Sequence, residues 1–400
     1  MGRKPVGAND SQGWLMQQVE NRSAEAASEN EGAAPPKRGF GLVAFPLLAL
    51  GLAVLLRLVP DLVDALPFAA EVALSIGILA ITIATVFVVL AHAEAIAHRV
   101  GEPYGTLVLT LAVTTIEASV IVSMMLHGEN NPTLARESVF STVMIVCAGV
   151  VGICLTLGGL RHRQQDLKRQ GTSALLAVII ALAGLTLVLP HFTLGAGPGN
   201  FTVAQLALVS LLCILLYGSF LLAQITRHRE DFVDALAPPL PAGHGRPSGR
   251  LPVRVLLLMA GLVGIVLLAE FVAVGLEESL VDLDVPQPDA VIGAFIATLV
   301  LLPESIAAIK ASYRNELQRS LNIALGSACA TIGLTIPVVA VAAIVTGRGL
   351  TLGLAPGDIV LLLLALAVSM VSFGTGRTNA LTGGVHLVIF VAYLLLIAVP

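Results

Sequence analysis

The sequence predicts an all-α integral membrane protein built mainly from two inverted repeats of five helices. Three observations lead to this fold class. Of the 400 residues, 56% are hydrophobic and only 12% are charged, with a mean hydropathy of +0.91, a balance far from that of soluble domains. The apolar runs are about 20 residues long, enough to cross a bilayer of about 30 Å. A glutamate also lies inside an apolar run in each half of the chain.

Eleven apolar runs are long enough to span the membrane. They cover roughly residues 41–59, 71–91, 104–126, 138–160, 172–190, 201–225, 253–276, 290–309, 318–346, 356–373 and 379–399. The first, placed at 40–60, is an additional N-terminal span. Residues 1–39 are polar and rich in Ala, Glu, Ser and Asn, which predicts a disordered cytoplasmic tail without a cleavable signal.

The distribution of Lys and Arg predicts the orientation of these spans. If the N-terminus is cytoplasmic, nineteen of the 22 basic residues fall in the tail or in cytoplasmic connections. Only Arg136 and Arg348 fall outside, and Arg57 lies near the end of the first span. Positive charge concentrates in cytoplasmic loops, so we expect the N-terminus inside and the C-terminus outside.

The spans after the first divide into two matching groups of five. The first repeat is expected at 66–226 and the second at 253–400, joined by a basic, Pro/Gly-rich cytoplasmic linker at 227–252. An odd number of spans inverts the second group relative to the first, as in many secondary transporters. Short matches support the repeat, since Ala-Glu followed eight residues later by Glu occurs in both halves. These glutamates are Glu94 and Glu102 in the first half, and Glu270 and Glu278 in the second.

Glu117 and Glu304 are the two central glutamates. Glu117 lies in GTLVLTLAVTTIEASVIVSMML and Glu304 in AVIGAFIATLVLLPESIAAI. A charged side chain in hydrocarbon costs about 2.5–3.5 kcal/mol on insertion scales, and ordinary packing offers no compensation. One carboxylate per repeat therefore predicts a site, near the middle of the membrane, where Glu117 and Glu304 bind a metal cation or protons. The alternative is a pair of structural carboxyl groups hydrogen-bonded between helices.

Neutral oxygens near these glutamates could complete a coordination shell. Pro303 lacks an N–H, so the carbonyl of Leu299 loses its helical partner and becomes available beside Glu304. Hydroxyl and amide oxygens suit hard cations such as Ca²⁺ and Na⁺. The full set of supporting polar groups is Thr114, Thr115, Ser119, Leu299, Ser305, Asn322 and Ser327. For any single Ser or Thr, a bond to its own helix is the open alternative.

The same two carboxylates suggest exchange. An empty site carrying two negative charges is costly to move through an occluded state, whereas a site neutralised by a cation or by protons is not. Burial also disfavours the charged form of a carboxyl group, so protons compete with the cation. If the site changes sides only with the cation or with protons bound, and never while empty, the two fluxes are coupled as antiport.

Further polar residues lie nearer the span ends and are candidates for gating or pH sensing. They are His92, Glu94, Glu102, Glu270 and Glu278, each with a structural or solvated role as the alternative. The four cysteines all fall in predicted spans, without metal-binding spacing. We therefore interpret them as small packing residues.

Two long motifs resemble the ChaA-type bacterial calcium/proton antiporters of the cation/calcium exchanger superfamily. They are HAEAIAHRVGEPYGTLVLTLAVTTIEAS (92–119) and LLPESIAAIKASYRNELQRSLNIALGSACATIGLTIP (301–337). The resemblance implies an eleven-span fold in the bacterial cytoplasmic (inner) membrane and export of cytosolic Ca²⁺ in exchange for H⁺. It also implies that Glu117 and Glu304 bind the cation and carry protons. ChaA-type members are associated with Na⁺/H⁺ and K⁺/H⁺ exchange as well.

The leading hypothesis is therefore a secondary antiporter for Ca²⁺ and H⁺ working by alternating access. A Na⁺(K⁺)/H⁺ antiporter of the same fold is the first alternative, and a passive cation channel, for which no re-entrant loop is evident, is the second. An intramembrane enzyme is disfavoured because HExxH and GxSxG motifs are absent from the sequence. No cofactor is expected. The expected partners are membrane lipid, the cation and protons, with no nucleic acid.

Overall fold

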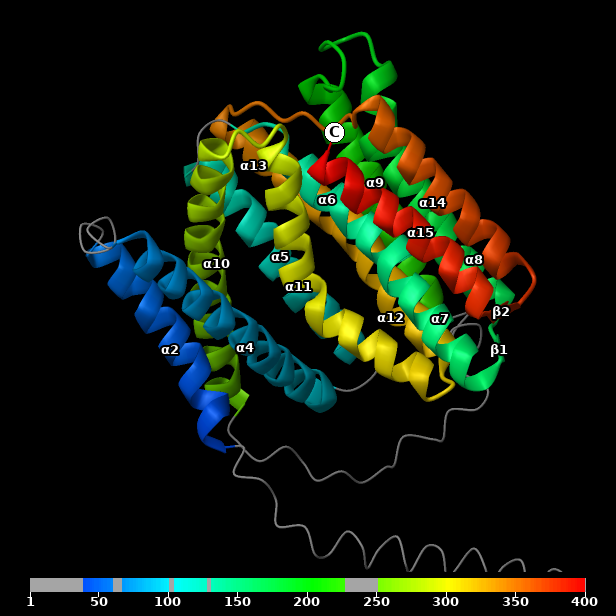
Figure 1. Ribbon diagram of the computed structural model, residues 1–400, viewed down its shortest axis with the longest axis horizontal. Helices are drawn as coiled ribbons and strands as arrows, with labels where there is room; N and C mark the ends of the chain where they lie inside the picture. Colours follow the sequence, from blue (N-terminus) through cyan, green and yellow to red (C-terminus); the bar gives the residue numbers. More distant parts are fainter. Residues whose placement is uncertain (1–38, 60–66, 101–103, 128–130, 227–250, 400) are drawn as a thin grey trace, which may run out of the picture. The chain divides into compact units, whose positions relative to one another are not determined.

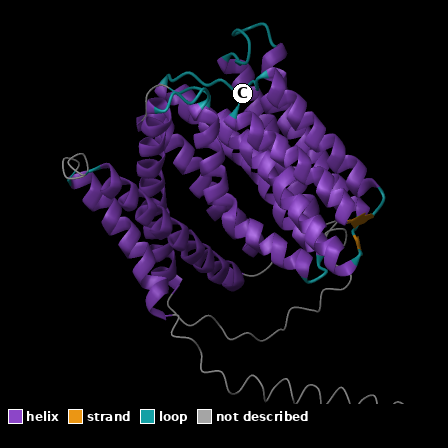
Figure 2. Cartoon of the chain, viewed as in Figure 1, coloured by secondary structure: helices purple, strands orange, loops and turns teal. Residues whose placement is uncertain are grey.

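The computed structural model describes residues 39–59, 67–100, 104–127, 131–226 and 251–399. Almost all of this part of the chain is helical, as Figure 2 shows. The predicted tail lies outside the described residues except for residue 39, and so does the predicted linker except for residues 251 and 252. Glu102 also lies outside them.

The helices of the first half follow the predicted spans closely. The chain forms α2 (Gly39–Leu58), α4 (Phe68–Val100), α5 (Tyr104–His127), α6 (Leu134–Met144), the π-helix η1 (Ile145–Val150), α7 (Val151–His162), α8 (Arg169–Ala183), the π-helix η2 (Gly184–Val188), the 3₁₀-helix η3 (Leu189–Phe192) and α9 (Val203–Ile225). A short strand β1 (Gln164–Asp166) separates α7 from α8.

The second half has the same order of long helices, but its strand follows the fourth span of the repeat instead of the third. It forms α10 (Leu251–Asp282), α11 (Pro288–Tyr313), α12 (Leu317–Ala330), the π-helix η5 (Thr331–Thr335), α13 (Ile336–Thr346), α14 (Pro356–Gly374), the strand β2 (Arg377–Asn379) and α15 (Ala380–Ala398). In each half, a continuous helical segment with a π-helix in its middle follows the helix that carries the central glutamate. These segments are α6–η1–α7 and α12–η5–α13.

The membrane-protein prediction is confirmed, with an approximate span count. Within the described residues, ten helical segments are long and apolar enough to cross a membrane. The remaining predicted span, 104–126, corresponds to helix α5, of which the shorter apolar segment 111–126 is described. Both segments with a central π-helix count as single spans, at 134–162 and 317–346.

Two main apolar clusters lie on either side of the glutamate-bearing helices. One joins α4, α5, α10 and α11, with Val89, Val120, Ile265 and Ile296 among its buried members. The other, much larger, joins helices α6–α9 and α12–α15, and α11 packs against it as well. Figure 1 shows α4 and α10 in one group of helices and α7, α8, α14 and α15 in another. Helix α11 therefore contributes to both clusters.

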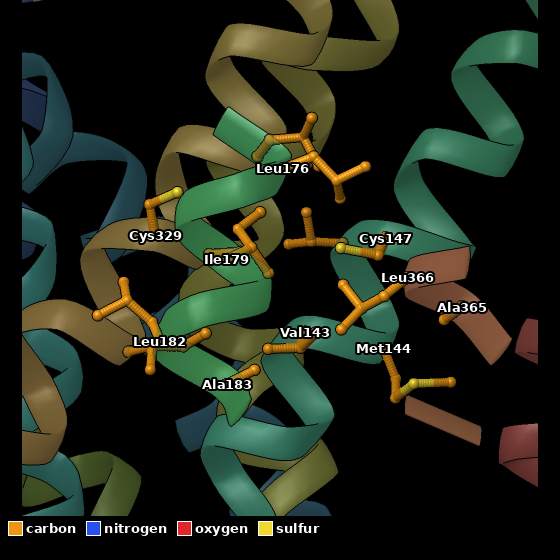
Figure 3. Close-up of a cluster of buried hydrophobic side chains, with 14 of the residues drawn as sticks. Val143, Met144, Cys147, Leu176, Ile179, Leu182, Ala183, Cys329, Ala365 and Leu366 are labelled. Atoms are coloured by element: carbon orange, nitrogen blue, oxygen red, sulfur yellow. The ribbon is translucent and has the colours of Figure 1, made fainter. Parts of the chain in front are cut away.

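The part of the larger cluster around Cys147 and Cys329 is lined mainly by apolar side chains. Figure 3 shows Cys147 and Cys329 among Leu, Ile and Val side chains of neighbouring helices. All four cysteines are free and buried. Their surroundings agree with the interpretation of cysteine as a packing residue.

Short backbone contacts connect the two halves at both ends of the bundle. Strands β1 and β2 pair antiparallel, with Gln165 opposite Thr378. At the other end, Asn200 and Thr351 form an antiparallel bridge. Because loop 193–202 belongs to the first half and loop 347–355 to the second, these contacts join the repeats in addition to the apolar clusters.

Candidate cation site

Both central glutamates line one cavity of about 260 Å³. The cavity lies between α5, α9, α11 and the α12–η5 segment. Its described lining residues are Val113, Thr114, Glu117, Tyr217, Phe220, Leu221, Gln224, Glu304, Arg319, Asn322, Ile323, Gly326, Ser327, Ala330 and Thr331. Residues 187 positions apart in the sequence are thus brought together by the inverted arrangement of the two repeats.

Glu117 is held by hydroxyl groups from both repeats. Its side chain is 3% exposed. The hydroxyl of Thr331 donates a hydrogen bond to Oε2 at 2.6 Å, and that of Thr142 donates to Oε1 at 3.4 Å. Thr142 belongs to α6 in the first repeat and Thr331 to η5 in the second. The two bonds fix the carboxyl group where the two repeats meet.

π-Helices occur beside the site in both repeats. Thr331 is the first residue of η5, and Thr142 lies three residues before η1. A π-helix widens the helical turn and interrupts the regular i to i−4 hydrogen bonds, and such segments are frequent at functional sites. Their occurrence at corresponding places in the two repeats shows that this feature of the backbone belongs to the fold.

Glu304 has a different environment. It follows Pro303 inside α11 and is half-buried. Its Oε2 atom is inaccessible to solvent and has no hydrogen-bond partner among the described residues. A buried polar atom without a partner is costly, and a cation or a proton bound to the carboxyl group would remove that cost. This carboxyl group therefore fits a ligand-binding role.

Helix α12 contributes one amide and one hydroxyl group to the cavity wall. Asn322 and Ser327 are both half-buried and both line the cavity. The Oδ1 atom of Asn322 accepts a hydrogen bond from Nε2 of Gln318 at 2.9 Å. The Oε1 atom of Gln318 in turn accepts from the backbone N–H of Lys168 at 2.8 Å. The first repeat thereby orients the asparagine of the second.

Some of the predicted supporting groups line the cavity and others do not. Thr114, Asn322 and Ser327 line the cavity, whereas Thr115, Ser119, Leu299 and Ser305 are not among its described lining residues. Thr115 is exposed, and its hydroxyl donates to the carbonyl of Leu111 at 2.6 Å. That bond within its own helix is the alternative that the sequence left open.

The cavity reaches the surface at one end of the bundle. Arg319, near the start of α12, has a side chain that is 56% exposed, and Gln224 lies near the end of α9. Both residues line the same cavity as the buried Glu117. The carboxyl groups are therefore reached from the end where α9 ends and α12 begins. In the orientation predicted from the basic residues, that end is cytoplasmic.

The second set of predicted residues is scattered. His92 is buried in α4, while Glu94, further along the same helix, is exposed. Glu270 is buried in α10 and Glu278 is exposed near the end of that helix. None of these four residues is among the described lining of the cation cavity.

The family is identified by a match that covers both repeats. The model of the family described as "Sodium/calcium exchanger protein" matches residues 70–226 and 253–399. The chain belongs to this family. It is a ChaA-type member of the cation/calcium exchanger superfamily, and it is a secondary transporter rather than an enzyme. The resemblance of the two long motifs is thereby confirmed.

Several relatives and solved structures support this assignment. The chain is 47% identical to y4hA of Sinorhizobium fredii, an ionic transporter by name, over 79% of this chain and 86% of that protein. It is 36% identical to the sodium-potassium/proton antiporter ChaA of Escherichia coli, over 82% and 89%. The solved structure of native YfkE aligns with a TM-score of 0.63 at 18% identity, covering 90% of this chain and 99% of that one. This last likeness concerns the fold alone.

The cavity combines two carboxyl groups with several neutral oxygens. Within the described residues, no three or more His, Cys, Asp or Glu side chains come together as a metal-binding group. A cation here would therefore depend on Glu117 and Glu304, with hydroxyl and amide oxygens or water completing its shell. Such a site has fewer charges than a permanent metal centre, which suits a cargo that must be released.

Sequence reasoning missed several lining residues on α9 and at the cavity mouth. Tyr217, Gln224 and Arg319 were not predicted for the site. Tyr217 is almost fully buried, with an exposed fraction of 2%. A tyrosine and a glutamine within an apolar span are a weak polar signal in the sequence. Only the packing of α9 against α13 and η5 brings them to the carboxyl groups.

Proposed function

We propose that this protein exports cytosolic Ca²⁺ in exchange for H⁺ by alternating access, with Glu117 and Glu304 binding either the cation or protons. The observation that carries the proposal is the shared cavity lined by both carboxyl groups. Two carboxylates neutralise a divalent cation, and neutral oxygens from Thr114, Asn322 and Ser327 are typical Ca²⁺ ligands. The cavity reaches the surface where α9 ends and α12 begins, as expected for a transporter state that is accessible from that side.

Proton coupling follows from the surroundings of the two carboxyl groups. Glu117 is buried under two hydroxyl groups, and Glu304 keeps a buried oxygen atom without a partner. In such surroundings two unneutralised negative charges are costly. Two protons and one Ca²⁺ each neutralise both negative charges and so remove this cost. We infer that access to the site switches from one side of the membrane to the other only when two protons or one Ca²⁺ are bound.

Na⁺(K⁺)/H⁺ exchange is the second candidate function. The observation that favours it is the 36% identity to the sodium-potassium/proton antiporter ChaA. Against it, a monovalent cation would leave one of the two carboxyl groups charged unless that group also binds a proton. The Ca²⁺ proposal is preferred on this charge argument.

We further propose the cytoplasmic (inner) membrane as the location, with the N-terminus inside and the C-terminus outside. The distribution of basic residues supports this orientation. The cavity described above would then face the cytoplasm. We also propose residues 66–226 and 253–400 as the two repeats, with residues 40–60 as an additional span.

The proposal is tested in inside-out membrane vesicles with an acidified lumen and a pH-sensitive dye. CaCl₂, NaCl and KCl are added separately, and Glu304→Gln serves as the control. Proton release on addition of CaCl₂, absent in the variant, is the expected result. Release with NaCl or KCl alone would establish the monovalent exchanger instead. Cation entry into the vesicles without proton release would indicate a channel.

A further inference from the structure

A second buried carboxylate is held by an arginine from the N-terminal helix. Glu270 in α10 has a side chain that is 9% exposed. Its two carboxylate oxygens each accept a hydrogen bond from the same guanidinium nitrogen of Arg57, at 3.1 Å. The hydroxyl of Ser123 donates to its Oε2 atom at 2.5 Å. Arg57 lies near the end of α2 and Ser123 on α5, the helix that carries Glu117.

This arrangement lies towards the end of the bundle opposite the mouth of the cation cavity. The mouth lies where α11 ends and α12 begins. Helix α10 ends at Asp282, and only five residues separate it from the start of α11, so its last turns lie at the opposite end. Glu270 belongs to the second half of α10. The contact therefore joins α2, α10 and α5 on the side away from the cavity mouth.

The helix that supplies the arginine is not part of the family match. The match begins at residue 70, whereas α2 ends at Leu58. From Ala44 onward, α2 packs against α4 and α10, with Ala49, Ala53, Ile78 and Leu268 in one buried cluster. At Gly264 an added Cβ atom would lie 2.8 Å from the backbone N of Leu50, so the two helices are in close contact. Arg57 is thus fixed on α10 by packing as well as by charge.

The corresponding glutamate of the other repeat is not held in this way. Glu94 in α4 corresponds to Glu270 in the Ala-Glu match of the sequence. Glu94 is exposed, and the structure shows no hydrogen bond or ion pair between it and another described residue. The glutamate of the second repeat is bonded and buried, while its counterpart in the first repeat is exposed to solvent.

We propose that Arg57, Glu270 and Ser123 form a latch that keeps the side opposite the cation cavity closed. In this proposal the guanidinium group serves as a tethered cation for Glu270. Its release allows α10 to move relative to α5 and so lets the opposite side open. The inference rests on the alternating access of the proposed function, and is independent of which cation is carried.

The surroundings of Glu270 allow such a release. A cavity of about 280 Å³ adjoins the ion pair, lined by Arg57, Ser75, Glu270 and Glu278 among others. Arg57 is half-exposed, with 51% of its side chain accessible. The guanidinium group therefore has space to withdraw, and the exposed Glu278 offers a second carboxylate for it. Ser75 is the polar group that α4 contributes to this cavity.

The test measures how accessible the cation cavity is when the latch is removed. The four native cysteines are buried, so Gln224→Cys provides a reporter at the cavity mouth for a water-soluble maleimide. Purified protein in detergent is used, which makes the result independent of membrane orientation. With the latch broken, the population open on the Gln224 side should fall. Arg57→Gln is expected to slow labelling about tenfold or more, the change typical of losing a charged hydrogen bond.

Matched variants decide whether the effect belongs to the latch. Glu270→Gln should slow labelling to a similar extent, and the double variant should slow it no further. Arg163→Gln, which removes an exposed arginine between α7 and β1, should leave the rate unchanged. An exposed reporter on α8, Ser173→Cys, corrects for intrinsic maleimide reactivity. Equal labelling in Arg57→Gln and the parent, or additive effects in the double variant, would overturn the proposal.

A milder variant covers the case in which Arg57→Gln does not fold. Ser123→Ala removes one hydroxyl group from the latch and keeps a residue that favours helix. It is expected to slow labelling about twofold, because one hydrogen bond to the carboxylate is lost. An unchanged rate in folded Ser123→Ala would contradict the role of α5 in the latch. Because labelling needs no transported ion, failure here is distinguishable from failure of the proposed Ca²⁺/H⁺ exchange.

Discussion

Glu117 and Glu304 occupy matching helices of the two repeats, yet their surroundings differ. Glu117 is 3% exposed and accepts hydrogen bonds from Thr142 and Thr331. Glu304 is half-buried, follows a proline, and has one buried oxygen atom without a hydrogen-bond partner among the described residues. The first carboxyl group is held in place, while the second is restrained less by hydrogen bonds.

This difference suggests that one carboxyl group of the site is fixed and the other is free to reorient. The hydroxyl groups around Glu117 keep its carboxyl group in one position, so it can serve as the constant part of the site. Glu304 can reorient at small cost, because reorientation breaks no side-chain hydrogen bond that the structure shows. An inverted repeat therefore supplies two equivalent backbone positions without making their chemistry equal.

Removing either charge should abolish exchange. Glu117→Gln and Glu304→Gln each leave one negative charge where the proposed site needs two. We expect each variant to lose at least about 100-fold in proton-coupled Ca²⁺ flux, since removing one partner of a buried charge pair costs about 3–5 kcal/mol. The measurement is dye-detected flux in vesicles with equal amounts of inserted protein. Full activity in either variant would falsify the two-carboxylate mechanism.

Shortening the side chains should separate the two positions. Glu117→Asp withdraws the carboxyl group from both threonine hydroxyls at once, whereas Glu304→Asp disturbs no such bond. We expect the apparent affinity for Ca²⁺ to fall about tenfold more in Glu117→Asp, in line with about 1.5–3 kcal/mol for a hydrogen bond to a charged group. Flux measured over a range of Ca²⁺ concentrations gives this ratio. Equal losses would show that both carboxyl groups are equally constrained.

The two threonines should contribute unequally to the position of Glu117. Thr331 donates at 2.6 Å and Thr142 at 3.4 Å. Thr331→Val is expected to weaken the apparent affinity about tenfold, as for a hydrogen bond to a charged group, and Thr142→Val only about threefold because its bond is longer. Valine keeps the shape and removes only the hydroxyl. Thr115→Val is the control, because its hydroxyl bonds to the carbonyl of Leu111 and it should behave as the parent protein.

The proline beside Glu304 should have the smallest effect. Pro303→Ala restores the N–H that can bond to the carbonyl of Leu299. If that carbonyl contributes to cation binding, the apparent affinity should fall about threefold, as expected for one neutral hydrogen-bonding group. The matched control is Pro46→Ala, a proline inside α2. An unchanged affinity in Pro303→Ala would remove the Leu299 carbonyl from the proposed site.

Much of the fold followed from the sequence. Long apolar runs identify membrane helices because hydrocarbon offers no hydrogen bonds and the backbone must satisfy itself within the helix. The predicted span 318–346 is the α12–η5–α13 segment, and the predicted spans 356–373 and 379–399 lie within a few residues of α14 and α15. Both central glutamates were singled out because a charge within an apolar run is costly wherever the chain folds.

The partners of those glutamates could not be predicted in the same way. Thr331 lies 214 residues from Glu117, and a threonine in an apolar helix carries no specific signal of its own. The π-helices that accompany the site have no clear sequence pattern. The bond between Arg57 and Glu270 spans 213 residues and depends on how α2 packs on α10.

Three properties of the protein were evident before folding was considered: about eleven membrane crossings, an inverted repeat, and one costly carboxyl group in each repeat. These follow from local composition and periodicity, whose energetic consequences do not depend on distant residues. The folded structure was needed to show that both carboxyl groups share one cavity, that Glu117 is held by two hydroxyls, and that Glu270 bonds to Arg57. Side-chain contacts between helices depend on packing and rotation, which neighbouring residues in the sequence do not specify.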